Sequence, residues 1–457
     1  MITIKKINEI YCEVNSDNEG ELEHIKEHFS YKVEYYIPAK MRTWYSKSDG
    51  KKSLFNITTH KFFLGLFEEL IKFISENNYE YSHDTNLGLS SSFSVLEAQE
   101  FIDSLNIPDQ YKPREYQIKY FIKAVRDKRK ILLSPTSSGK SLIMYLLYMY
   151  YKTKCLIIVP YSNLTDQLYK DFENYGCKDH STLLVETWQS LIQRQEKFFQ
   201  NFGVVICDEV HHARCDSITK IMQKIPQAQI RIGLTGTLSD KELDQKQIIG
   251  LFGPTCRYTT TTDLIEKGFN TPLLIKAIGL NHNMSKHFDY EDEMNYLIHS
   301  ERRDRFMVRL ALSLKGNTFL MFKNIAHGHR LLKMLSDERK DRKTFYVDGS
   351  ISKEDREYIR QEIEKSNDSI TLASTVFATG VNITSIHNII LAHPTKARVK
   401  ILQSIGRGLR HNENKKLLTV FDIYDILKNN TTYRHYLERE KIYKAEGFPI
   451  KDYQINL

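Results

Sequence analysis

Short apolar runs alternate with longer amphipathic stretches from about residue 111 to the end of the chain. Such runs are typical of strands buried on both faces, as in parallel sheets, and the stretches between them have the period of covering helices. The alternation therefore predicts α/β architecture with parallel sheets. The expected strands are 131–133, 156–160, 204–207 and 230–234 in one sheet, and 318–322, 344–347, 369–373, 388–392 and 417–421 in a second.

Residues 1–107 have a different pattern, in which strand-like runs surround two helical stretches. This pattern predicts a small α+β domain. Its expected strands are 1–4, 11–14, 31–35 and 54–57, and its expected helices are 21–28 and about 61–75. A Ser- and Gly-rich stretch and then Ile107-Pro108 predict a linker. We thus expect three domains, at 1–107, 108–265 and 266–457, as the length of 457 residues also favours.

Composition fits a globular protein, with 41% hydrophobic and 27% charged residues. The net charge of +8 is unevenly distributed: residues 1–107 hold 11 Lys and Arg against 17 Asp and Glu, so the remainder holds 54 against 40. A polyanion is therefore expected to bind the two α/β domains. Six cysteines without framework spacing, and no signal or membrane-spanning segment, predict a reduced protein of the cytoplasm.

The most informative motif joins the strand at 131–133 to a helix at 142–148 and runs from Ser134 to Ser141. It matches the phosphate-loop pattern G-x-x-x-x-G-K-[ST], with Ser134 in place of the first glycine. The backbone of Thr136, Ser137, Ser138 and Gly139 would surround the phosphates. Lys140 would reach the β- and γ-phosphates, and Ser141 would bind Mg²⁺. The alternative interpretation of this motif is an ordinary strand-to-helix turn without a nucleotide.

A second motif, Asp208-Glu209-Val210-His211, follows the strand at 204–207. In an open α/β sheet, ligands gather at strand ends of this kind. Asp208 would hold Mg²⁺ and Glu209 would orient or deprotonate the attacking water, as phosphoryl transfer to water requires. The alternative is a zinc cluster with Cys207, His211, His212 and Cys215, which is disfavoured because Cys207 belongs to the apolar strand.

Other candidates flank these motifs. Gln117 could hydrogen-bond an adenine edge, and Thr187, just past a strand end, could contact a nucleic-acid backbone. Arg42 and Trp44 lie where cations and aromatics interleave, which predicts either base stacking with phosphate attraction or a solvated hairpin with Trp44 in its own small core. In the second half, Arg407 and Arg410 share one helix face and can converge on an anion.

The order of these motifs resembles that of the superfamily 2 helicases with a D-E-x-H box, from about Tyr111 to the end of the chain. Within the superfamily, the chain is similar to the branched-DNA helicases of tailed bacteriophages. That closer similarity rests on the loop 135–141, the Thr187-Trp188-Gln189 segment, the helix 403–410 and the small N-terminal domain with its aromatic-basic stretch.

The resemblance implies two RecA-like domains in tandem with ATP in the cleft between them. It also implies that His211 and Gln403 couple the γ-phosphate to the cleft and that Arg407 and Arg410 act as arginine fingers. Thr379 and Gly380 match a segment that contacts the nucleic-acid backbone in the family, although Val381-Asn382 departs from the family's Asp.

The expected activity is ATP-dependent, Mg²⁺-requiring unwinding or branch migration of branched DNA in recombination, repair and replication. The expected protein is a monomer in the host cytoplasm that acts on junctions, D-loops and R-loops, the last including RNA–DNA hybrids. Two alternatives stay open, because the motifs mainly address the nucleic-acid backbone. One is an RNA helicase of the same superfamily, and the other is a non-catalytic nucleic-acid-binding or annealing protein on an ATPase fold.

Overall fold

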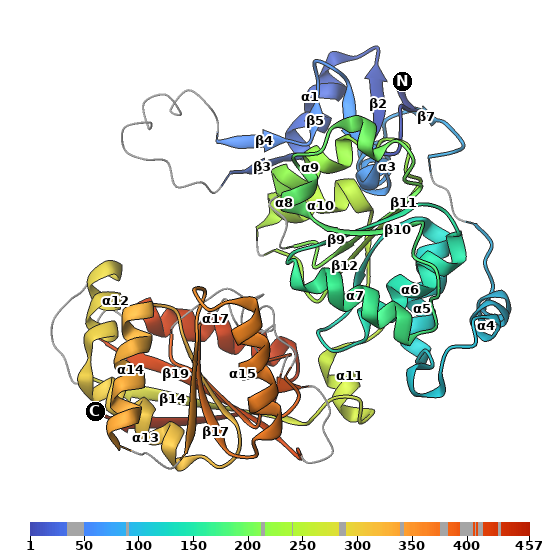
Figure 1. The fold of residues 1–457 in the computed structure, drawn as a ribbon. Helices are drawn as coiled ribbons and strands as arrows, with labels where there is room; N and C mark the ends of the chain where they lie inside the picture. Colours follow the sequence, from blue (N-terminus) through green and yellow to red (C-terminus); the bar gives the residue numbers. More distant parts are fainter. Residues whose placement is uncertain are drawn as a thin grey trace. The chain divides into compact units, whose positions relative to one another are not determined.

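The computed structural model describes residues 1–457 apart from 34–49, 88–90, 212–214, 240, 283–288, 339–341, 375–382, 394–404, 407, 410–414 and 428–430. Contacts divide the chain into two compact units, residues 1–134 with 139–258 and residues 135–138 with 259–457. Figure 1 colours the first unit mainly from blue to green and the second mainly from yellow to red. The domain boundaries expected from the sequence stay a prediction.

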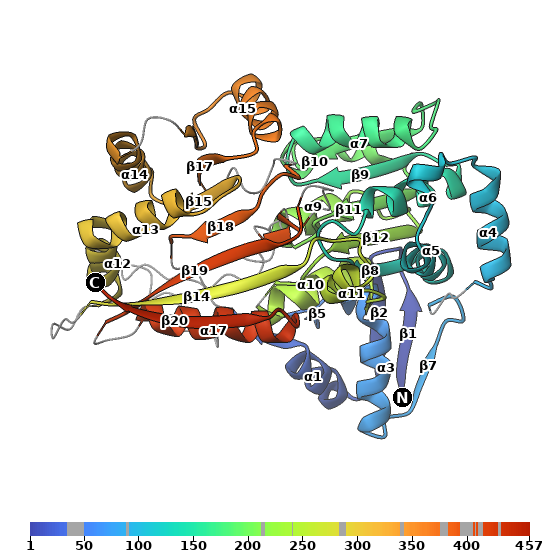
Figure 2. The same cartoon turned by 90° about the horizontal axis from the view of Figure 1, so that it is seen from below.

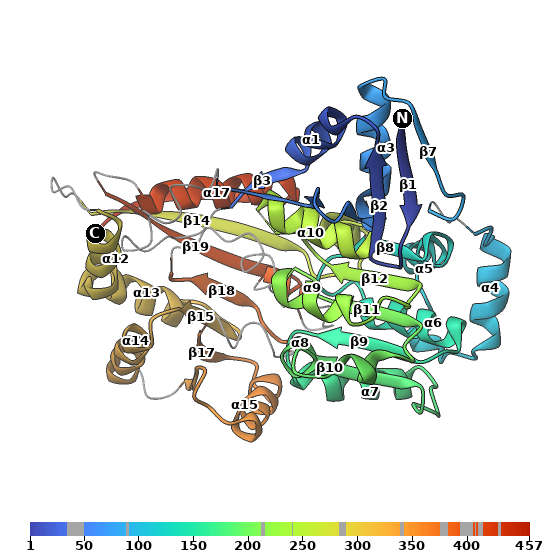
Figure 3. The ribbon, with the colours of Figure 1, turned by 90° about the horizontal axis from the view of Figure 1, so that it is seen from above.

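The first unit begins with a mixed five-stranded sheet in the order β5-β6-β2-β1-β7. Helices α1 and α3 pack beside β1 and β2 (Figure 3), and their apolar side chains share one core with the sheet. A separate pair of antiparallel strands joins β3 to β4. The elements are β1 Ile2–Lys6, β2 Tyr11–Ser16, α1 Glu19–His28, β3 Ser30–Lys32, β4 Lys51–Ser53, β5 Phe55–Asn56, β6 Lys61–Phe63, α3 Phe67–Glu76 and β7 Tyr81–His83.

The helix expected over about 61–75 is wrong in its first part. Lys61–Phe63 forms strand β6, a 3₁₀ turn follows at Leu64–Leu66, and α3 begins only at Phe67. Phe62 is fully buried in the sheet, where it pairs with Cys12 and Phe55. Gly65 lies so close to the backbone of helix α10 (Glu242–Phe252) that a Cβ atom would be 2.1 Å from the carbonyl oxygen of Ile249. Tertiary packing has therefore overridden the helical period.

The second part of this unit is a parallel six-stranded sheet in the order β10-β9-β11-β12-β8-β13. Helices α5–α7 lie on one face and α8–α10 on the other (Figure 1). The elements are α4 Val95–Ser104, α5 Glu115–Asp127, β8 Arg129–Leu133, α6 Lys140–Tyr151, β9 Cys155–Val159, α7 Asn163–Asn174, β10 Leu183–Thr187, α8 Trp188–Leu191, β11 Val204–Asp208, α9 Cys215–Gln223, β12 Ile230–Thr235, α10 Glu242–Phe252 and β13 Thr255–Cys256.

The N-terminal sheet is packed firmly against this parallel sheet. Leu243 of α10 belongs to the core of the N-terminal sheet, and Ile10 belongs to the core of the parallel sheet. Ion pairs add to the contact, because Glu69 binds Lys246 at 2.6 Å and Glu9 binds Arg129 at 3.0 Å. The two sheets therefore form a single compact unit.

The second unit is built on a parallel seven-stranded sheet in the order β16-β17-β15-β18-β19-β14-β20. Helices α13 and α14 cover one face, and α15 and α17 cover the other. Figure 2 shows the long strands β14, β19 and β20 beside α17. The elements are α11 Thr261–Glu266, β14 Leu273–Asn281, α12 Tyr290–His299, α13 Glu301–Ser313, β15 Thr318–Phe322, α14 Ile325–Glu338, β16 Lys343–Val347, α15 Lys353–Lys365, β17 Ser369–Ser374, β18 Asn388–Leu391, β19 Leu418–Ile426, α17 Thr431–Ala445 and β20 Ile450–Asn456.

The predicted fold class is confirmed, with two RecA-like parallel sheets in tandem after a small α+β sheet. Within the described residues, no helix has both the length and the apolar character needed to cross a membrane.

Candidate nucleotide-binding site

The loop between β8 and α6 is shaped by two residues with left-handed backbone conformation. Ser137 has φ of +66° and Gly139 has φ of +75°. The φ of Gly139 favours glycine, and a Cβ atom there would lie 2.5 Å from Nε2 of Gln117. At its start, the loop is fixed to the neighbouring strand, because the N–H of Ser134 donates to the carbonyl of Thr235 at 2.8 Å. The chain then enters α6 at Lys140, which places the helix N-terminus at the loop.

Gln117 connects α5 to this loop. Its side chain accepts a hydrogen bond from the N–H of Arg114 at 2.8 Å and donates one to the carbonyl of Gly139 at 3.2 Å. It is only 3% exposed. The structure thus brings Gln117 to the phosphate loop as the motif order implied, and its contact with adenine stays a prediction.

Lys140 and Glu209 meet at the carboxyl edge of the parallel sheet. Nζ of Lys140 lies 2.9 Å from Oε1 of Glu209, and the two side chains are 11% and 17% exposed. Glu209 has φ of +44°, a conformation that is costly for a residue with a side chain and that occurs at functional sites. Its N–H donates to Oδ1 of Asp208 at 2.9 Å. Lys140, Asp208 and Glu209 therefore form one cluster.

Asp208 is the buried member of this cluster. Burial raises the pKa of its carboxyl to about 7, the negative charge of Glu209 adds to the increase, and Lys140 opposes it. A cation bound beside this carboxyl would favour its ionised form. The hydroxyl of Ser141 lies 2.8 Å from that of Tyr175. A carboxyl and a hydroxyl are oxygen donors of the kind that Mg²⁺ prefers, so the predicted pair of Asp208 and Ser141 fits this ion.

His211 links the carboxylates to the next strand. Its Nδ1 hydrogen-bonds to the hydroxyl of Thr235, which itself donates to the carbonyl of Thr237 at 2.7 Å. The same nitrogen lies 3.5 Å from Oε2 of Glu209. Cys207, in contrast, packs into the apolar core of the sheet, so the alternative zinc cluster lacks this ligand.

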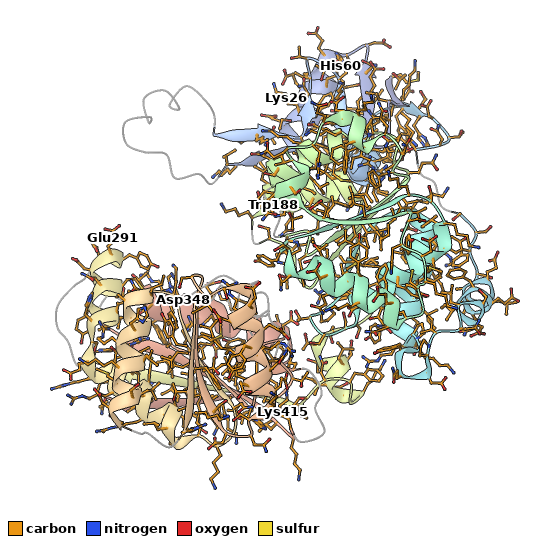
Figure 4. All side chains as sticks on the ribbon, in the orientation of Figure 1. Lys26, His60, Trp188, Glu291, Asp348 and Lys415 are labelled. Carbon is orange, nitrogen blue, oxygen red and sulfur yellow. The ribbon has the colours of Figure 1, made fainter. Side chains whose placement is uncertain are left out.

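Thr187 lies at the end of β10, and Tyr175 lies beside Ser141. Thr187 caps α8, because its hydroxyl accepts a hydrogen bond from the N–H of Ser190 at 3.4 Å. Trp188, labelled in Figure 4, begins that helix. A contact of Thr187 with nucleic acid stays a prediction. The contact between Tyr175 and Ser141 was not predicted, because the two residues are 34 positions apart and no local pattern joins them.

The remaining predicted site residues stay predictions because they lie outside the described residues. They are Arg42, Trp44, Thr379, Gly380, Gln403, Arg407 and Arg410.

Comparisons with known proteins agree with this fold. Residues 110–240 match the family described as type III restriction enzyme, res subunit, and residues 302–412 match the helicase conserved C-terminal domain. The chain belongs to superfamily 2 of the ATP-dependent helicases. It is similar to the ATP-dependent DNA helicase uvsW of Enterobacteria phage T4, with 30% identity over 451 residues that cover 91% of this chain and 88% of the relative.

Other relatives extend the same comparison. DNA 3′-5′ translocase XPB2 of Sulfurisphaera tokodaii is 24% identical over 74% of this chain and 88% of its own length. The crystal structure of T4 UvsW superposes with a TM-score of 0.51 at 26% identity, covering 100% of this chain and 99% of that one. A fragment of an HsdR subunit of a type I restriction enzyme from Vibrio vulnificus, at 18% identity, shares the fold with a TM-score of 0.60 over 78% of this chain and 71% of its own.

Proposed function

We propose that this helicase acts on DNA and uses ATP hydrolysis to unwind or branch-migrate junctions, D-loops and R-loops in recombination, repair and replication. The observation that carries the proposal is the similarity to a protein named as an ATP-dependent DNA helicase, which covers 91% of the chain. That coverage is too large to be confined to the two motor domains, so it includes part of the N-terminal sheet. In this proposal, the N-terminal domain, with Arg42 and Trp44, adds contacts to DNA.

The site suggests how ATP would be engaged. Lys140 is paired with Glu209 at 2.9 Å, and phosphate oxygens of ATP would replace Glu209 as its partner. Glu209 would then be released to orient or deprotonate the attacking water. Mg²⁺, held by Ser141 and Asp208, would supply charge neutralisation at the phosphates. Gln117 and His211 would hold the two ends of the bound nucleotide, and the backbone of Thr136, Ser137, Ser138 and Gly139 would surround its phosphates.

Coupling to DNA is proposed to depend on the second RecA-like domain. Arg407 and Arg410 would stabilise the charge that develops on the γ-phosphate, and Gln403 would sense that phosphate. Thr379, Gly380 and Thr187 would contact the DNA backbone. If DNA favours the conformation in which the arginines reach ATP, DNA binding accelerates turnover and loss of the γ-phosphate weakens that conformation.

One assay series tests the proposal. ATP turnover is measured with branched DNA, linear duplex, single-stranded DNA and RNA as stimulants. We expect the highest turnover with branched DNA, and loss of turnover in Lys140→Ala and Glu209→Gln. Lys119→Ala is the matched control, because Lys119 forms an exposed ion pair with Glu115 on α5. Equal turnover with and without DNA would contradict the coupling, and stronger stimulation by RNA would favour the RNA helicase.

A further inference from the structure

A cavity of about 520 Å³ lies at the N-terminal end of β8, where the N-terminal sheet meets the first parallel sheet. Its wall contains five cationic side chains and three carboxylates, with Leu64, Phe67, Leu87 and Pro254 among its apolar residues. The cations are Lys6, Lys123, Lys128, Arg129 and Lys130. Because β8 leads into the phosphate loop at its other end, this cavity and the nucleotide site are about 13 Å apart along one strand.

Two of the carboxylates in the wall are each shared between two cations. Glu9 binds Lys6 at 2.7 Å through one oxygen and Arg129 at 3.0 Å through the other. Asp127 binds both Lys123, at 3.0 Å, and Lys130, at 2.8 Å. The wall therefore holds more positive than negative charge, although most of these side chains are shielded from water.

A second arginine lies directly beside Arg129. In the register of the sheet, Arg231 of β12 pairs with Arg129 of β8, and Arg231 is fully buried. Its Nε donates to the carbonyl of Ala228 at 3.0 Å, and its Nη2 donates to that of Ile225. The Nη1 atoms of both arginines are buried and have no hydrogen-bond partner among the described residues.

Burial of this pair is costly. It lowers the pKa of Arg129 to about 10, which Glu9 opposes, and it lowers the pKa of Arg231, to which the charge of Arg129 adds. Arginine stays protonated in proteins, so both guanidinium groups carry their positive charge in a buried environment. The excess of five cations over three carboxylates in the wall therefore points to an anionic ligand, and Arg231 adds positive charge beside Arg129.

We propose that the cavity at the start of β8 binds a small phosphate-bearing anion against Arg129 and the neighbouring lysines, with Arg231 behind Arg129 adding to the positive charge. Guanidinium and ammonium groups suit phosphate oxygens, which accept several charged hydrogen bonds at once. The volume exceeds that of inorganic phosphate, so a phosphate monoester with a small organic body also fits. Bound there, the anion would join the N-terminal sheet to the motor domain and stabilise the first unit.

The test uses thermal unfolding and isothermal titration calorimetry on the full chain with Lys140→Ala, which weakens phosphate binding at the nucleotide site. Inorganic phosphate, AMP and adenosine are compared at millimolar concentration, with chloride at matched ionic strength. We expect phosphate and AMP, but not adenosine or chloride, to raise the unfolding temperature. A larger effect of AMP than of phosphate would identify a monoester, and equal effects would identify phosphate itself.

Variants at the cavity decide the assignment. Arg129→Gln is expected to weaken phosphate binding about tenfold or more, since it removes charged hydrogen bonds. Lys128→Asn is the second test in case Arg129→Gln is poorly folded, because asparagine tolerates the φ of +56° at this position. Arg305→Gln, at an exposed ion pair with Glu301, is the control and should bind phosphate normally. Absence of a phosphate effect, or an equal effect in Lys128→Asn and the control, would overturn the proposal.

Discussion

The two parallel sheets share one architecture but use charged residues differently. In the first sheet, the ion pair of Lys140 and Glu209 stays 11% and 17% exposed at the carboxyl edge. In the second sheet, Arg439 with Asp422 and Arg303 with Asp425 are at most 2% exposed. The first arrangement leaves charge accessible to a substrate, whereas the second uses charge to hold strands and helices together.

The buried groups of the second sheet are extensively paired. Arg439 of α17 binds both oxygens of Asp422 on β19, and Tyr443 donates to the same carboxylate at 2.8 Å. Burial acts to lower the pKa of Arg439, but the neighbouring Asp422 holds this pKa above its ordinary value. Substitutions of Lys140 or Glu209 should therefore reduce ATP turnover without unfolding the protein. Substitutions in the buried pair of Arg439 and Asp422, in contrast, should unfold it.

The largest effect is expected for Arg407, which is proposed to stabilise the γ-phosphate during ATP hydrolysis. We predict that Arg407→Ala lowers ATP turnover by about 10³ to 10⁵, as for other arginine fingers, with DNA affinity nearly unchanged. Phosphate release is measured together with DNA binding over a range of salt concentrations. If Arg407 instead contacts a DNA phosphate, affinity will fall and the salt slope will decrease by about 0.9.

A smaller effect, on stability, is expected in the second sheet. Arg439→Met leaves Asp422 buried without its cation and should lower the free energy of unfolding by about 3–5 kcal/mol. Urea unfolding is the measurement. The matched control is Arg305→Met, whose exposed pair with Glu301 should contribute little. Equal stability of the two variants would show that Arg439 does not hold α17 to β19, and replacing Asp422 by Leu as well should restore part of the loss.

Much of the fold was predictable because strands buried on both faces leave continuous apolar runs. The strand expected at 318–322 is β15 to the residue, and that at 204–207 is β11 with one residue added. In contrast, β20 was not predicted, because it is a largely exposed edge strand without an apolar run. Its position depends on pairing with β14, which lies 175 residues earlier in the chain.

The nucleotide site and the cavity at the start of β8 differ in the same way. The phosphate loop and the cluster of Asp208 and Glu209 consist of residues adjacent in the chain, so their spacing was informative. The cavity at the start of β8 joins Glu9 to Arg129 across 120 residues, and no local pattern indicates that contact. A site whose residues are brought together only by tertiary packing therefore could not be predicted from the sequence.

The smallest effect is a pH dependence in the second sheet. Burial lowers the pKa of His393 to about 3, and the charges of Lys323 and Arg303, followed by those of His327 and Arg439, add to the decrease. His393 follows β18, whose neighbouring carbonyl at Ala392 accepts a hydrogen bond from Arg303 at 2.8 Å. The imidazole is therefore held neutral beside cations.

Because the unfolded chain binds a proton near pH 6.5 and the folded chain does not, stability should fall as the pH drops below that value. Between pH 7 and pH 5, the contribution of His393 amounts to about 2 kcal/mol. The free energy of unfolding is measured in urea at both pH values for the parent and for His393→Gln, since other groups titrate equally in both. We expect the parent to lose about 2 kcal/mol more than the variant. A parallel change in the two proteins would mean that His393 takes up its proton in the folded state and that this edge of the second sheet tolerates an added charge.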